Sequence, residues 1–214
     1  MIISIDGNIG SGKSSGLQYL HNEFSSLGLR CFPEPVALWR NVEGTDLLAE
    51  CYSKNESYTC FRTQTYIMST MAKLYSDQIE DNSILIFERS IFSAQKIFAQ
   101  NFFNNTSLSR TDFGILEQQF ELFKQLTPVP DVFIYLRCDP ETCLERINYR
   151  GNLESGGTVS LEYLQNIHKL YDQFFLEDND RQIPMLRIVD GSGTEATVRS
   201  LLTLTIEDIL AERK

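Results

Sequence analysis

The residues from Gly7 to Ser15, GNIGSGKSS, have the types and the spacing of a phosphate-binding loop. Gly7 and Gly12 flank four residues and are followed directly by Lys13 and Ser14. In such a loop, backbone N–H groups close around phosphate oxygens, the lysine adds a positive charge, and the hydroxyl can bind Mg²⁺. The apolar run before the loop and the helical pattern after it favour this interpretation over a chance glycine turn. The motif therefore predicts a site for a nucleoside triphosphate. The predicted loop residues are Gly7, Asn8, Ile9, Gly10, Ser11, Gly12, Lys13, Ser14 and Ser15.

Charged side chains follow the second and third apolar runs of the chain. Glu34 precedes a proline, which keeps Glu34 extended, and a carboxylate there can accept a proton from an attacking hydroxyl. Glu88 and Arg89 follow the third run. Taken singly, these residues fit a solvent-exposed carboxylate and a local ion pair. Together with Lys13 they place four charged groups on one expected rim, which is costly without a charged ligand.

Two arginines, Arg146 and Arg150, are four residues apart on one face of an expected helix that runs into a glycine-rich segment at 151–157. In phosphoryl transfer, arginines on a closing segment neutralise the transferred group and exclude water. A surface arginine pair is the simpler alternative. We expect a lid over about residues 146–157.

The charged residues and the phosphate loop must be positioned by helices and strands. The pattern of apolar residues predicts a fold of the α/β class. Five short runs have the length of buried strands, and stretches with helical spacing, such as 161–175 and 198–210, lie between or after them. Alternation of strands and helices predicts a five-stranded parallel sheet flanked by helices. The predicted strands are Ile2–Ile5, Leu29–Phe32, Ile84–Phe87, Val132–Leu136 and Leu186–Val189.

The composition of the chain limits the kinds of binding partner that we expect. A chain of 214 residues fits a single domain over 1–214, and a net charge of −10 disfavours nucleic acid and anionic membranes as partners. The five cysteines are odd in number and form no C-x-x-C pair, so neither a disulfide framework nor a zinc site is indicated. The apolar MIISI leads straight into the loop and leaves no room for a removable leader. We expect a cytoplasmic protein, unless an organellar leader has been removed from this chain.

Four segments in order, GNIGSGKSS, EPVALWRNVEG, ERSIFSA and LERINYRGNLESG, resemble the deoxyribonucleoside kinases. The similarity runs from Ile2 to about Phe175 and is greatest to the insect multisubstrate and mitochondrial thymidine kinase branch. The resemblance implies a P-loop kinase fold with an arginine-bearing lid. It also implies a homodimer that uses ATP and Mg²⁺ to phosphorylate the 5′-hydroxyl of a deoxynucleoside.

The resemblance also implies roles for the charged residues. Glu34 would be the general base, and Arg89 would lie beside the 5′-oxygen and the transferred phosphoryl group. Lys13 would bind the β and γ phosphates, while Ser14 and Glu88 would hold Mg²⁺. The lid arginines would be Arg146 and Arg150.

A second group of residues is matched to the nucleoside. Tyr52 and Glu154 would meet the sugar 3′-hydroxyl, and the base would lie between Trp39 and Phe98. Gln64 would read the base edge, because an amide offers both a donor and an acceptor and can serve thymine or cytosine. The substrate residues implied are Glu34, Trp39, Tyr52, Gln64, Ile67, Met71, Arg89, Ala94, Phe98 and Glu154.

Two of these residues predict a preference for pyrimidines, thymidine first and deoxycytidine next. Ala94 stands where the deoxycytidine kinase branch carries an aspartate, and Met71 suggests an apolar recess for the thymine methyl. The chain also departs from the family at four positions. Thr63 replaces an aromatic residue before Gln64, and the lid has Asn148, Asn152 and Ser155 where further charged residues are usual.

Two alternatives stay open. A nucleoside monophosphate kinase such as thymidylate kinase shares the loop and a lid, but it needs cationic groups for the phosphate of its acceptor. A non-catalytic nucleotide-binding protein shares only the loop, and Glu34 argues against it.

Overall fold

The computed structural model describes residues 1–78, 83–151, 159–177 and 183–212. Its centre is a five-stranded sheet in the order β2-β3-β1-β4-β5, in which every pair of neighbouring strands is parallel. This confirms the predicted α/β fold. The strands are β1 (Ile2–Asp6), β2 (Leu29–Phe32), β3 (Ile84–Glu88), β4 (Val132–Arg137) and β5 (Leu186–Asp190).

Four of the strands extend one residue beyond the predicted apolar run, and that residue is charged in each case: Asp6, Glu88, Arg137 and Asp190. The apolar run ends where the strand reaches the rim of the sheet, because charged groups are costly to bury without partners. Charged residues therefore gather at the carboxyl edge of the sheet, where ligands bind in open parallel sheets.

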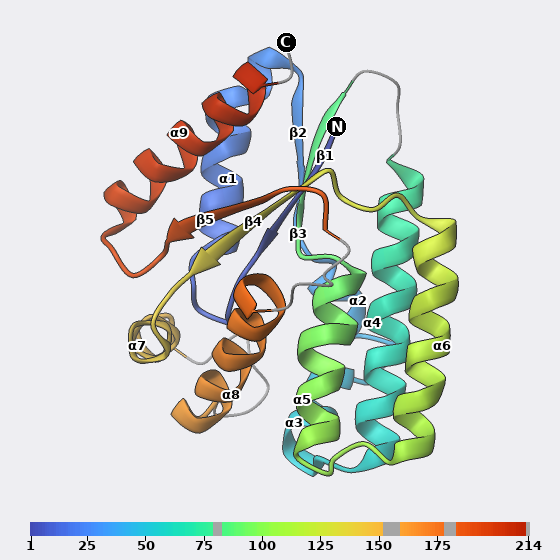
Figure 1. The fold of residues 1–214 in the computed structure, drawn as a ribbon. Coiled ribbons are helices and arrows are strands. Elements are labelled where there is room, and N and C mark those ends of the chain that lie inside the picture. Colours follow the sequence, from blue (N-terminus) through green and yellow to red (C-terminus); the bar gives the residue numbers. More distant parts are fainter. Residues whose placement is uncertain (79–82, 152–158, 178–182, 213–214) are drawn as a thin grey trace.

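One face of the sheet is covered by α1 (Lys13–Phe24) and α9 (Glu195–Glu212), with a short 3-10 helix at Ser25–Leu27 (Figure 1). Ile84 and Ile86 of β3 point to this face and pack in an aliphatic core. Their neighbours Leu85 and Phe87 point to the opposite face, because successive side chains of a strand alternate. The aliphatic core thus holds the phosphate-loop helix α1 against the sheet.

The opposite face is covered by an aromatic-rich helical layer, drawn at the lower right of Figure 1. Its long helices are α4 and α6, whose bounds the sequence patterns did not delimit. The elements are α2 (Val36–Trp39), α3 (Leu47–Lys54), α4 (Ser57–Asp77), the π-helix η2 (Ser93–Ala99), α5 (Gln100–Asn104) and α6 (Arg110–Leu126).

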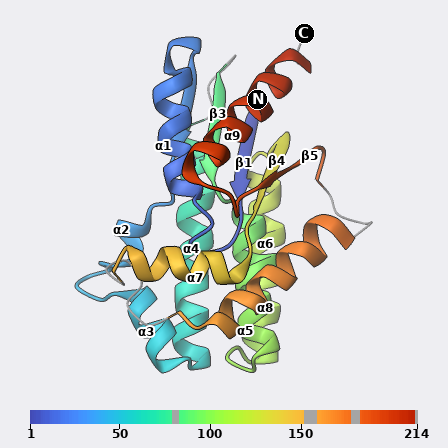
Figure 2. The same cartoon turned by 90° about the vertical axis from the view of Figure 1, so that its left-hand side faces the viewer.

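Two further helices lie beyond the carboxyl ends of the strands (Figure 2). The first, α7 (Pro140–Tyr149), begins at the predicted Asp139-Pro140 step, where proline at the first helical position loses no hydrogen bond. The second, α8 (Leu161–Asp172), continues into a π-helix, η3 (Gln173–Glu177), and covers the predicted helical stretch 161–175. No helix in the described part of the chain is long and apolar enough to span a membrane.

Candidate active site

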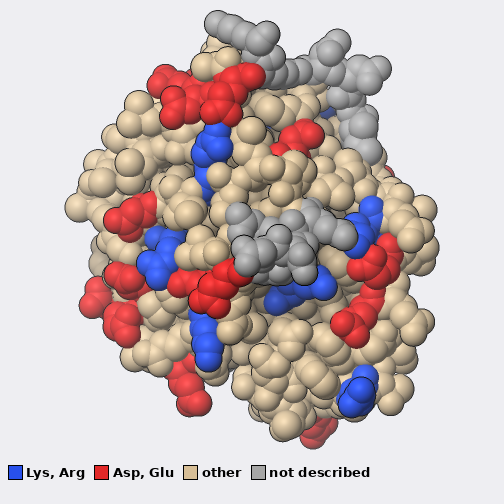
Figure 3. All heavy atoms as spheres, viewed as in Figure 1, with Lys and Arg blue, Asp and Glu red and all other residues tan. Residues whose placement is uncertain are grey.

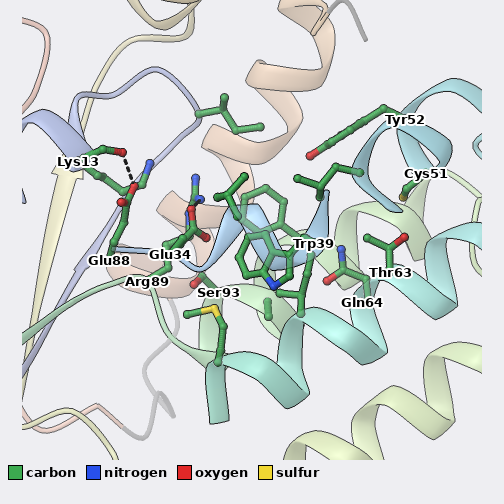
Figure 4. A pocket seen from close by; sticks show the side chains of 18 of the residues that line it. Lys13, Glu34, Trp39, Cys51, Tyr52, Thr63, Gln64, Glu88, Arg89 and Ser93 are labelled. Carbon is green, nitrogen blue, oxygen red and sulfur yellow. Dashed lines mark hydrogen bonds and ion pairs between the residues drawn. The ribbon is translucent and has the colours of Figure 1, made fainter. Parts of the chain in front are cut away.

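A cavity opens at the carboxyl edge of the sheet and extends between α2, α3, α4 and η2 (Figure 4). Charged side chains lie at one end and mainly neutral ones at the other, and we call these the charged end and the neutral end. The predicted site residues that line the cavity are Ile9, Gly10, Lys13, Ser14, Glu34, Trp39, Tyr52, Gln64, Ile67, Met71, Glu88, Arg89, Ala94, Phe98 and Arg150. The predicted residues outside its lining are Gly7, Asn8, Ser11, Gly12, Ser15 and Arg146. Glu154, Asn152 and Ser155 lie outside the described residues.

The phosphate-loop sequence forms a loop between β1 and α1, as predicted. Gly10 and Gly12 have φ angles of 81° and 100°, in the left-handed region that favours glycine. A Cβ at Gly10 would lie 2.5 Å from the carbonyl oxygen of Cys143, so α7 packs directly on the loop. The Asn8 Nδ2 donates to the carbonyl oxygen of Leu164 in α8 at 2.8 Å. The loop is therefore held in shape by both helices beyond the strand ends.

Lys13, the first residue of α1, is buried, and its Nζ donates to the carbonyl oxygen of Asn8 at 2.7 Å. Burial and the nearby positive charge of Arg89 together lower the pKa of Lys13 to about 8, although Glu88 and Glu34 act in the opposite direction. A lysine in this setting gains from an anionic ligand, because the ligand restores the stability of its charge.

Ser14 and Glu88 meet beside Lys13, where the Ser14 Oγ donates to the Glu88 Oε1 at 2.8 Å (Figure 4). The two residues are 74 positions apart in the sequence and come from α1 and the end of β3. A hydroxyl and a carboxylate are hard oxygen ligands of the kind that Mg²⁺ prefers, and Mg²⁺ keeps several of its waters. The pair therefore fits Mg²⁺. No cluster of three or more His, Cys, Asp or Glu side chains suited to a metal occurs among the described residues.

Glu34 and Arg89 form a buried ion pair, with the Arg89 Nη1 2.5 Å from the Glu34 Oε2. The Arg89 Nη2 also donates to the carbonyl oxygen of Gly7 at 3.2 Å, which ties the pair to the phosphate loop. Burial raises the pKa of Glu34, and the positive charge of Arg89 opposes this rise only in part. Burial works against the charge on Arg89, but Glu34 and its other neighbours raise the pKa of Arg89 well above its ordinary value. Glu34 is thus a carboxylate made more basic by its surroundings.

The neutral end is formed by helical residues. Gln64, Ile67 and Met71 come from α4, and Ala94 and Phe98 come from η2. Gln64 is only 3% exposed, and its Oε1 is buried without a hydrogen-bond partner in the structure. A buried amide oxygen without a partner is costly, so a ligand that donates a hydrogen bond there is favoured.

Trp39 is buried and also lines the cavity. Its Nε1 donates to the Thr70 Oγ1 at 2.8 Å, so the indole is held in one orientation. The Thr63 Oγ1 is directed at the backbone carbonyls of Leu47 and Thr59, at 3.1 and 2.8 Å. The small side chain of Thr63 therefore widens the neutral end without offering it a free hydroxyl donor.

Tyr52 lines the cavity from α3 and contacts Tyr163 of α8, with the two hydroxyl oxygens 3.4 Å apart and the rings edge to face. Burial raises the pKa of Tyr52 to about 12, so its hydroxyl stays neutral at physiological pH. The sequence analysis did not single out Tyr163, because the helical spacing of apolar residues in α8 indicated only the face that packs in the core.

The two predicted lid arginines differ in their surroundings. The Arg146 Nη1 and Nη2 donate to the carbonyls of Gly191 and Gly193 at 2.7 and 2.6 Å. Arg150 follows α7, is exposed and lines the cavity. Arg146 therefore joins α7 to the loop after β5, whereas Arg150 is the one that faces the cavity.

Asp6, at the end of β1, is a polar residue of this region that the sequence analysis missed. It is 1% exposed, its Oδ2 accepts from the Ser4 Oγ at 2.5 Å, and its Oδ1 has no hydrogen-bond partner among the described residues. Burial raises the pKa of Asp6, although Ser4, Ser93, Arg89 and Lys13 all favour its charged form. Its position in the sequence, directly before Gly7 of the phosphate loop, could have pointed to it.

On the face drawn in Figure 3, the Lys and Arg side chains of the described residues are scattered among Asp and Glu and form no continuous basic stripe.

Comparisons with known proteins agree on one family. The family model described as deoxynucleoside kinase matches residues 3–211. Human mitochondrial thymidine kinase 2 is 32% identical over 82% of this chain and 64% of the relative, so the chain spans less than two thirds of that protein. Human deoxycytidine kinase is 32% identical over 87% of this chain and 82% of the relative, and chicken deoxycytidine kinase 2 is 30% identical over 86% and 80%. The chain belongs to the deoxynucleoside kinase family.

Proposed function

We propose that this protein transfers the γ-phosphoryl group of ATP to the 5′-hydroxyl of a deoxynucleoside, with pyrimidines preferred, thymidine first and deoxycytidine next. The observation that carries the proposal is the cavity itself. It joins the phosphate loop and the Glu34–Arg89 pair to a neutral end with a buried, unpartnered amide oxygen on Gln64. Such a cavity suits a phosphate donor and a neutral acceptor at opposite ends.

ATP is the proposed phosphate donor. The loop residues Gly7–Ser15 would surround its phosphates, and Lys13 would bind the β and γ phosphates. Mg²⁺, when bound by Ser14 and Glu88, would neutralise charge on the phosphate oxygens. Arg150, which faces the cavity, would add a second cation from the proposed lid at about 146–157.

In the chemical step, Glu34 would accept the proton of the 5′-hydroxyl while the 5′-oxygen bonds to the γ-phosphorus. The bond from that phosphorus to the β–γ bridging oxygen would break, and ADP would leave. A raised pKa favours the proton transfer, because a more basic carboxylate is a better proton acceptor. The guanidinium of Arg89 is already held in place by Glu34 and the carbonyl of Gly7, and its other N–H groups would stabilise the negative charge on the transferred group.

A neutral nucleoside fits the far end of the cavity better than a nucleoside monophosphate. Tyr52, Gln64 and Trp39 carry no charge there, whereas a monophosphate kinase needs cations for the phosphate of its acceptor. Gln64 can pair with thymine or cytosine, and Met71 and Ala94 leave an apolar recess suited to the thymine methyl. These features support the order thymidine, then deoxycytidine.

Three further parts of the proposal depend on the family resemblance and on composition. They are a homodimer, a single domain over 1–214, and a cytoplasmic location. A relative is named mitochondrial, so location stays a prediction. Sedimentation equilibrium, which gives the mass of the particle in solution, tests the dimer against the monomer mass of 24.6 kDa.

The test of the function uses ATP and Mg²⁺ with five acceptors in parallel: thymidine, deoxycytidine, deoxyadenosine, deoxyguanosine and dTMP. We expect phosphorylation of thymidine, then deoxycytidine, at their 5′-hydroxyls. Transfer only to dTMP would establish the monophosphate kinase instead, and a purine preference would overturn the pyrimidine claim. Nucleotide binding without transfer to any acceptor would establish the non-catalytic alternative.

A further inference from the structure

The backbone of Arg89 is held in an uncommon conformation. Its φ angle is +59°, in the left-handed region that residues with a side chain rarely adopt. Its backbone N–H donates to the carbonyl oxygen of Ile5 at 3.0 Å, and its own carbonyl oxygen accepts from the hydroxyl of Tyr75 at 2.9 Å. Conformations of this kind persist only where the surroundings fix them, and here hydrogen bonds fix the peptide groups on both sides.

The guanidinium of Arg89 is fixed as well. Besides its bonds to Glu34 and to the carbonyl of Gly7, its Nε donates to the hydroxyl of Tyr171 at 3.3 Å. A guanidinium has five N–H donors in one plane. Within the described residues, these three bonds leave one N–H on each terminal nitrogen. Because Arg89 lines the cavity, these two N–H groups are the ones available to a ligand.

The two tyrosine hydroxyls are themselves held firmly. The ring of Tyr171, in α8, is fully buried and stacks on the rings of Tyr135 and Phe175, with centroids 5.5 and 6.0 Å away. The ring of Tyr75, in α4, stacks on Phe87 with centroids 3.9 Å apart. Burial raises the pKa of both tyrosines, so both hydroxyls are neutral at physiological pH. Neither hydroxyl can swing away without disturbing a packed ring.

We propose that Tyr75 and Tyr171 are positioning residues for Arg89. Tyr75 holds its backbone in the left-handed conformation, and Tyr171 fixes the plane of its guanidinium. Together they direct its two remaining N–H groups to the place where the 5′-oxygen and the transferred phosphoryl group react. The inference rests on the proposed function. It adds that hydroxyl groups from two separate helices, α4 and α8, determine the orientation of the arginine that stabilises the transferred charge.

The experiment compares three variants that each remove one buried hydroxyl and keep the ring: Tyr75→Phe, Tyr171→Phe and Tyr135→Phe. Tyr135→Phe is the matched control, because the Tyr135 hydroxyl donates to Asp172 at 2.8 Å and does not contact Arg89. With ATP, Mg²⁺ and thymidine, we expect kcat to fall about tenfold in Tyr75→Phe and Tyr171→Phe, with KM for thymidine within about threefold, because misorientation of a group that acts in the transition state lowers kcat. We expect kcat of Tyr135→Phe within about twofold of wild type.

A double-mutant cycle with Arg89→Lys separates positioning from a general loss of structure. Lysine has no Nε–H and no planar fork, so Tyr171→Phe should lower kcat by less than about twofold in the Arg89→Lys protein. An equal loss in both backgrounds, or an equal loss in all three tyrosine variants, would overturn the inference. So would normal kcat in Tyr75→Phe and Tyr171→Phe while the wild-type protein phosphorylates thymidine. A wild-type protein that phosphorylates no nucleoside would overturn the proposed function itself.

Discussion

At the charged end of the cavity Glu34 binds Arg89 and Ser14 binds Glu88, whereas at the neutral end the Oε1 of Gln64 is buried and has no hydrogen-bond partner in the described part of the chain. The charged groups lie at strand ends and on the phosphate loop, and the neutral ones lie on α2, α3, α4 and η2. The charged groups hold one another in place before any ligand binds, and Arg89 keeps one N–H on each terminal nitrogen for a ligand. The neutral end has hydrogen-bonding capacity that only a ligand can fill.

Because of this difference, we expect mutations at the two ends to change different kinetic constants. A group that acts in the transition state changes kcat when it is lost, whereas a group that binds substrate and transition state equally changes KM. We therefore expect the charged end to control kcat and the neutral end to control KM.

The largest effect is expected for Glu34→Gln. The amide keeps the size of the side chain but cannot accept the proton, so kcat for thymidine should fall by about 10² or more while KM stays within a few-fold. Steady-state kinetics with ATP and Mg²⁺ measure both. Glu50→Gln, which changes a surface glutamate paired with Lys54 and Arg62, is the control. Near-normal turnover of Glu34→Gln would remove Glu34 from the role of general base.

Gln64→Leu tests the neutral end. Leucine keeps roughly the same volume and loses the amide, so KM for thymidine should rise about 20-fold with kcat within about threefold. The matched control is Gln95→Leu, because Gln95 is also buried with an unpartnered Oε1 but does not line the cavity. A loss of kcat at constant KM would contradict the division between the two ends.

The pH profile tests the electrostatics of the charged end. With a pKa of about 8, Lys13 is charged below that pH and neutral above it, so kcat/KM for ATP should fall about tenfold per unit well above pH 8. Glu34 must be ionised, and burial raises its pKa, so the acid limb should lie above the ordinary glutamate value of 4.5. Rates measured across this pH range, at low and at saturating ATP, give the acid limb and the basic limb of the pH profile. A profile of kcat/KM that stays flat from pH 7 to pH 10 would show that Lys13 keeps its charge.

The smallest effect concerns the thymine methyl. If Met71 lines the recess for this methyl group, deoxyuridine should be used about fourfold less efficiently than thymidine, since burial of one methyl group contributes about 0.8 kcal/mol. Met71→Ala should reduce this discrimination to less than about twofold. Competition assays with both nucleosides measure the ratio of kcat/KM directly. An unchanged ratio in Met71→Ala would place the methyl elsewhere in the cavity.

Much of the fold follows from local patterns in the sequence. All five strands were predicted within one residue, because buried parallel strands are short apolar runs, and four of the five end at a charged residue directly after the predicted run. The phosphate loop followed from glycine spacing, and Glu34, Glu88 and Arg89 followed from their positions at strand ends. The helices between residues 47 and 126 were not delimited, because their buried faces are set by the aromatic core they share and not by a single clear stripe.

The chemical groups at the carboxyl edge of the sheet can be read from the sequence, since the residues that follow each strand are a local property of the chain. The contacts that hold those groups depend on the fold. It placed Tyr171 against Arg89 across 82 positions of sequence, Asn8 against α8, and the Arg146 guanidinium on the carbonyls of the loop after β5. These contacts join segments that are far apart in the chain. Each depends on how whole helices pack against the sheet, and no local pattern encodes that packing.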